Sequence, residues 1–120
     1  MFSSLFSVGS VVHVGGSRTI QAFSEQAAIV SQVVLGLAKV GCKFHIGCAV
    51  GGDGLAIRAL VSGGYAQALQ VYAIGLPSGQ GYWSSSDPKA VELARGAGSI
   101  IHYSAGGHIV KVPLTQRLFV

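Results

Sequence analysis

Two glycine-rich segments hold the polar side chains of this sequence that are best suited to bind an anion. Residues 15–18 read Gly-Gly-Ser-Arg, and residues 51–54 read Gly-Gly-Asp-Gly. Glycine lets the backbone approach a phosphate closely, and the free amides at a helix N-terminus attract negative charge. The hydroxyl of Ser17 and the guanidinium of Arg18 can add charge-assisted hydrogen bonds. These segments therefore predict a site for a small anionic ligand of the nucleotide type.

The elements around these segments alternate between strand and helix. Apolar and β-branched runs predict strands over residues 8–14, 43–47, 69–74 and 99–103. Helical spacing predicts one helix between a Ser24 cap and Gly41, and another over residues 54–61. A third helix is expected from the Asp87 cap to residue 95, with Gly96 closing it, and Pro113 marks the start of a short last helix. The alternation predicts an α/β fold with a mainly parallel sheet, in one domain over residues 1–120.

Glycines follow every predicted strand. The carboxyl ends of parallel strands meet at one edge of the sheet, and ligands of such sheets bind there. One glycine turn is more often only a tight turn, whereas four turns on one edge favour a ligand site. The predicted ligand-binding residues are Gly15, Gly16, Ser17, Arg18, Gly47, Gly51, Gly52, Asp53, Gly54, Gly75 and Gly106.

Several polar and aromatic residues near this edge allow two interpretations. Asp53 is placed to cap a helix, a role compatible with ligand contact. Arg18 and Arg58 are also consistent with solvated positions on a loop and a helix face. Tyr82 and Trp83, an adjacent aromatic pair in the expected loop over residues 75–86, can stack on a base or anchor the loop.

Catalysis and metal binding have little support in the residue pattern. Acid–base chemistry on a glycosidic bond usually needs a pair of groups in one cleft, and among the acids only Asp53 is placed at the expected site. The histidines lie mainly in strand contexts, where packed and hydrogen-bonded roles are common. We therefore expect no catalytic residue, no metal and no cofactor. The histidines are His13, His45, His102 and His108.

The composition favours a compact ligand over a long polyanion. Eight Lys and Arg stand against four Asp and Glu, but the bases are scattered and form no run. The apolar stretch over residues 27–40 is too short to span a membrane, and residues 1–6 lack the positive charge of a secretory signal. Cys42 and Cys48 flank a predicted strand, about 20 Å apart, beyond the reach of a disulfide. We expect buried free thiols and a cytoplasmic protein.

Two stretches resemble the Rossmann fold of DNA-processing protein A (Smf), a member of the SLOG superfamily. Residues 11–18 are similar to its strand followed by Gly-Ser-Arg, and residues 46–58 to its Ser-Gly-x-Ala-x-Gly-x-Asp-x-x-Ala-His segment. Weaker similarity covers residues 71–75 and the Pro113 and Arg117 region. The resemblance implies a Rossmann-like three-layer sandwich with four to five strands. It also implies a nucleotide site in which Asp53 accepts a hydrogen bond from a ribose or base group.

Departures from the family pattern separate three functions. Val50 stands where the DNA-processing branch commonly has Arg, and the Pro-Gly-Gly-x-Gly-Thr-x-x-Glu stretch of the Lonely Guy phosphoribohydrolases is missing. We therefore expect a module that senses or sequesters a nucleotide or nucleotide-derived signal. The alternatives are a single-stranded-DNA-binding module and, third, a nucleotide N-glycosidase.

Self-association is a further expectation. Charged residues make up only 10% of the chain, so few remain to solvate an apolar surface. The fourth predicted strand, over residues 99–103, lies where the family sheet continues, and an open strand edge is a template for another chain. We expect a homodimer or higher oligomer.

Overall fold

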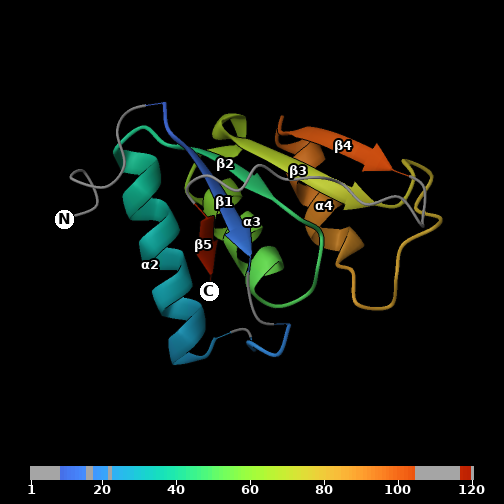
Figure 1. Cartoon of the computed structure of the whole chain (residues 1–120), viewed down its shortest axis with the longest axis horizontal. Coiled ribbons are helices and arrows are strands. Elements are labelled where there is room, and N and C mark those ends of the chain that lie inside the picture. Colours follow the sequence, from blue (N-terminus) through green and yellow to red (C-terminus); the bar gives the residue numbers. More distant parts are fainter. Residues whose placement is uncertain (1–8, 16–17, 22, 105–116, 120) are drawn as a thin grey trace.

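A five-stranded parallel sheet forms the centre of the molecule. The computed structural model describes residues 9–15, 18–21, 23–104 and 117–119. The strands are β1 (Val11–Gly15), β2 (Lys43–Ile46), β3 (Leu69–Ile74), β4 (Ile100–Ser104) and β5 (Arg117–Phe119). Their order is β4-β3-β2-β1-β5, and every neighbouring pair is parallel (Figure 1). The predicted α/β class with a mainly parallel, Rossmann-like sheet is confirmed.

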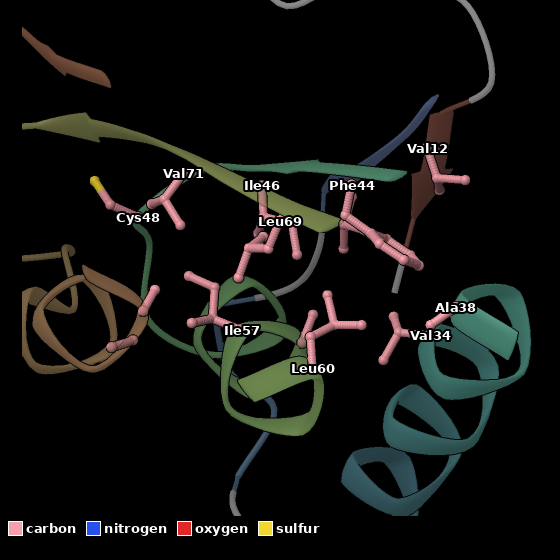
Figure 2. Close-up of a cluster of buried hydrophobic side chains, with 14 of the residues drawn as sticks. Val12, Val34, Ala38, Phe44, Ile46, Cys48, Ile57, Leu60, Leu69 and Val71 are labelled. Atoms are coloured by element: carbon pink, nitrogen blue, oxygen red, sulfur yellow. The ribbon is translucent and has the colours of Figure 1, made fainter. Parts of the chain in front are cut away.

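The three described α-helices all lie on one face of this sheet. They are α2 (Glu25–Lys39), α3 (Gly52–Ser62) and α4 (Pro88–Gly96), and a 3₁₀ turn, η1 (Ala66–Ala68), precedes β3. Figure 2 shows the helices side by side beneath the strands. From β1 to β4, each new strand lies beside the previous one, always further in the same direction across the sheet. Right-handed crossovers that all run in this direction place their helices on the same face. In the described part of the chain, no helix covers the other face.

Local sequence signals explain where the helices begin and end. The hydroxyl of Ser24 accepts a hydrogen bond from the Ala27 amide at 3.1 Å and caps α2, as predicted. Asp87 caps α4 in the same way through the Ala90 amide. The predicted end of α4 was wrong, because Gly96 is helical and the left-handed residue is Gly98, with φ of 103°.

The core lies between the sheet and the helices (Figure 2). Its strand residues alternate along each strand, since successive side chains point to opposite faces. Replacing a fully buried core leucine such as Leu60 by alanine costs about 2–5 kcal/mol. The largest fully buried residues are Phe44, Leu37, Ile46, Ile57, Leu60, Leu69, Val12, Val34 and Val71.

The opposite face of the sheet carries a row of rings. The ring centroids of His13 and His45 are 4.9 Å apart, those of His45 and Tyr72 are 5.2 Å apart, and those of Tyr72 and His102 are 4.6 Å apart. The alternation that sends Val12 and Phe44 into the core sends these rings to the other side. The three histidines thus pack in strands, as predicted.

The last described element differs from the prediction. The chain forms β5 beside β1, where a helix beginning at Pro113 was expected; Pro113 itself lies outside the described residues. Both cysteines, Cys42 and Cys48, are buried and form no disulfide, in agreement with the prediction. Within the described residues no helix is long and apolar enough to cross a membrane.

Candidate functional site

Residues 47–51 connect the carboxyl end of β2 to the start of α3. Gly51 lies at the N-cap with φ of 83°, a left-handed conformation that favours glycine. Among the described residues no side chain caps this helix, and its first backbone hydrogen bond runs from the Leu55 amide to the Gly51 carbonyl at 2.9 Å. The amides of Gly52 and the two residues after it therefore have no partner within the helix.

Asp53, in the first turn of α3, is buried and only partly satisfied. Its residue is 9% exposed, and its Oδ2 accepts a hydrogen bond from the Ala49 amide at 3.3 Å. Its Oδ1 is buried and has no hydrogen-bond partner in the part of the chain that the structure describes. Burial raises the pKa of Asp53 to about 6, against the smaller opposing effect of the Ala49 amide. A buried carboxylate oxygen without a partner is costly, so this group needs an explanation.

Gly47 leaves room for this carboxylate. A Cβ atom at Gly47 would lie 2.9 Å from Oδ2 of Asp53, closer than such atoms approach in proteins. The side chain of Asp53 is therefore folded back against the end of β2. Two residues that the sequence assigned to one site, Gly47 and Asp53, are in direct contact.

An ion pair joins α3 to the start of α4. Nη1 and Nη2 of Arg58 donate to Oδ2 and Oδ1 of Asp87 at 2.7 and 3.1 Å, and the Asp87 amide donates to the Cys48 carbonyl at 2.6 Å. Although burial raises the pKa of Asp87, the hydrogen bonds from Arg58 and Ala90 bring it below its ordinary value. Arg58 is therefore more than a solvated residue of the helix face. Because 29 positions separate the partners, no local pattern reveals the pair.

The ion pair also explains a glycine of the predicted site. A Cβ atom at Gly54 would lie 2.5 Å from Oδ2 of Asp87 and 2.9 Å from Nη1 of Arg58. Gly54 is thus needed to let the Asp87 carboxylate lie against α3. In this structure its small size serves packing between the two helices.

The loop between β3 and α4 is held at both ends. The ring of Tyr82 lies against Gly75, where a Cβ atom would be 2.6 Å from the ring. At the other end, Ala49 and Ser86 form an antiparallel bridge, and the Val50 amide donates to the Ser85 carbonyl at 2.9 Å. Trp83 stays 53% exposed. Tyr82 is thus the anchor of this loop.

The predicted residues fall into three groups. Gly15, Gly47 and Gly75 follow or end parallel strands and lie at the same edge of the sheet, which also carries the start of α3 (Figure 1). Arg18 lies exposed in the turn after β1, and within the described residues no hydrogen bond or ion pair joins it to Asp53. Gly16, Ser17 and Gly106 lie outside the described residues.

Two surface hollows lie elsewhere, beside α2. One, of about 690 Å³, runs between α2 and α3 and is mainly apolar; Phe23, at its rim, has φ of 64° and is fully exposed. The other, of about 500 Å³, is lined by residues just before α2 and in its first turn: Thr19, Ile20, Gln21, Ser24 and Gln26. Among the described residues that line them there is no predicted ligand-binding residue. The described residues also contain no group of three or more metal-ligating side chains.

Comparison with family models, with curated proteins and with solved structures found no match to this chain. The resemblance to the SLOG superfamily therefore stays a prediction. A function for this protein has to be inferred from the geometry of Asp53 and its neighbours at the carboxyl edge of the sheet.

Proposed function

We propose that this protein is a binding module for a small anionic ligand of the nucleotide type, held at the carboxyl edge of the sheet. The observation that carries the proposal is Asp53, a buried carboxyl group with one unpartnered oxygen in the first turn of α3. The parallel sheet supports the same edge, because ligands of open α/β sheets bind beyond the carboxyl ends of the strands.

A charged Asp53 is expected to lower the stability of the ligand-free protein. Its raised pKa means that burial disfavours the charged form. A carboxyl group kept under such conditions is typical of functional sites, where stability is given up for binding or chemistry. A ribose hydroxyl or a base N–H donating to Oδ1 would satisfy the oxygen, so binding would relieve the cost.

The anionic part of the ligand needs a separate partner, because Asp53 repels a phosphate when it is charged. The free amides at the start of α3 and the guanidinium of Arg18 are the positive groups of this edge. The ligand is therefore expected to be bifunctional, with an anionic end and a neutral hydrogen-bond donor. A nucleotide has both.

The test begins with mass spectrometry of small molecules that co-purify with the protein. Calorimetry with adenosine monophosphate then compares the unmodified protein with Arg18→Ala and Asp53→Asn. Each change should weaken binding by about 1.5–3 kcal/mol, the range for a hydrogen bond to a charged group. Arg95→Ala is the matched control, since Arg95 pairs with Glu92 on the exposed face of α4. Unchanged affinity in both site variants would refute the proposed site.

The same calorimetry separates this function from DNA binding. A single-stranded DNA of some tens of nucleotides should bind no more tightly than the mononucleotide. Much tighter DNA binding that falls steeply with salt would instead support a DNA-binding module, because phosphate contacts release counterions.

Hydrolysis of an N-glycosidic bond is a second candidate, favoured by one observation. The pKa of Asp53, raised to about 6, lies near the pH at which general acids and bases work best. Asp87, the other carboxyl group close to α3, is held in its ion pair with Arg58. Chromatography of adenosine monophosphate after long incubation decides the matter: free base points to the enzyme, and intact nucleotide to the binding module.

We also propose that the protein is a homodimer in the cytoplasm. In the described part of the sheet β4 is an edge strand, paired with β3 alone, and its first residue, Ile100, is 56% exposed. An exposed apolar edge strand favours pairing with a second chain.

A further inference from the structure

Trp83 is the single tryptophan of the chain, and it is exposed although the loop around it is ordered by contacts. The residue before it, Tyr82, packs against Gly75. The residues after it form a turn, in which the Ser86 amide donates to the Trp83 carbonyl at 2.9 Å. The indole lies between these two fixed points and is 53% exposed, so part of its surface is open to a ligand.

The same contacts connect the backbone of Trp83 to the candidate site. The turn brings Trp83 close to Ser86, and Ser86 forms a bridge with Ala49. The Ala49 amide in turn donates to Oδ2 of Asp53. Three links, two between backbone segments and one from the Ala49 amide to the carboxylate, thus connect Trp83 to Asp53.

We propose that Trp83 is the stacking platform for the base of the ligand, which makes the site selective for base-bearing nucleotides, and for purines over pyrimidines. This inference rests on the proposed function and names the part of the ligand that Trp83 recognises. Indole offers a flat apolar face, and a purine covers more of it than a pyrimidine does. An aromatic ring held in place before binding loses little entropy when a base stacks on it.

The experiment uses the full chain and two readouts. Adenosine, uridine and ribose 5-phosphates are titrated by calorimetry, and Trp83 fluorescence is followed in parallel. Because the chain has one tryptophan, quenching reports contact at this residue alone. The variants are Trp83→Ala and Trp83→Phe, with Ile100→Ala as the control. Ile100 is similarly exposed, but it is the first residue of β4 and so lies at the amino ends of the strands, away from the carboxyl ends.

Stacking predicts that Trp83→Ala weakens adenosine monophosphate binding on the order of 10- to 100-fold. Trp83→Phe should restore part of that loss, and Ile100→Ala should bind like the unmodified protein. The affinity for ribose 5-phosphate, which has no base, should be the same with and without the indole.

Two results would overturn the inference. If Trp83→Ala binds adenosine monophosphate normally while Arg18→Ala and Asp53→Asn bind it weakly, the stacking role is wrong and the proposed function stands. If the unmodified protein binds neither the nucleotides nor ribose 5-phosphate, the proposed function fails and the stacking role fails with it.

Discussion

Replacing Asp53 by asparagine should make the protein more stable at pH 8. The carboxyl group has a pKa of about 6 in the folded protein, against 3.8 for the ordinary group. Because the pKa is raised in the folded protein, the protonated carboxyl group contributes to stability. This contribution is fully present below about pH 3.8 and is lost as the pH rises through about 6. Asparagine keeps an oxygen for the Ala49 amide and carries no charge.

The size of the effect follows from the shift. A difference of roughly two pKa units corresponds to about 3 kcal/mol between the charged and neutral forms. At pH 8 the free energy of unfolding of Asp53→Asn should therefore exceed that of the unmodified protein by about 2–3 kcal/mol, and below about pH 4 the two should nearly agree.

Urea unfolding between pH 4 and 8, at fixed protein concentration, measures this difference. Asp87→Asn is the matched control with the opposite sign. The pKa of Asp87 is lowered, and its carboxylate caps α4 and pairs with Arg58, so its removal should reduce stability above the ordinary pKa. The reasoning would be refuted if Asp53→Asn were less stable than the unmodified protein at pH 8, or if the stability of both proteins changed with pH in the same way. Asp53 would then be a structural residue.

Three further predictions concern packing, assembly and pH. Gly54→Ala should lower the free energy of unfolding by about 1–3 kcal/mol in urea, because its Cβ displaces the Asp87 carboxylate; Gly96→Ala, with open space around it, should not. Ile100→Lys should convert a dimer to a monomer by light scattering, and a mass already monomeric before the change would refute the dimer. Burial and the neighbouring His13 and His102 lower the pKa of His45, so stability should fall as the pH drops below about 6.5. His45→Gln should make this fall smaller; an unchanged dependence of the free energy of unfolding on pH, measured in urea, would contradict this.

Elements with local signals could be predicted from the sequence. The strand Leu69–Ile74 was predicted with both bounds, because an apolar run ends there at Gly75. The start of α2 was predicted from Ser24, whose hydroxyl makes the expected bond to the Ala27 amide. Such signals act within a few residues and need no knowledge of the rest of the fold.

Features set by distant residues could not be predicted. The strand Arg117–Phe119 is short, and its position is fixed by pairing with β1, about a hundred residues earlier in the chain. The row of rings from His13 to His102 depends on the register of four strands. Local pattern gives the alternation along each strand but not which strands become neighbours.

The sequence assigns Asp53 to the candidate site, and its role there stays a prediction. The structure adds that Asp53 and Asp87 have different environments. Both Asp53 and Asp87 lie at helix starts, so from sequence alone both are caps. In the fold, Asp87 is satisfied by Arg58 and Ala90 and its pKa falls, whereas Asp53 keeps an unpartnered oxygen and its pKa rises. Groups whose surroundings push their pKa values apart divide their roles in the same way. Asp87 therefore holds α3 and α4 together, and Asp53 is the carboxyl group that we propose a ligand would meet.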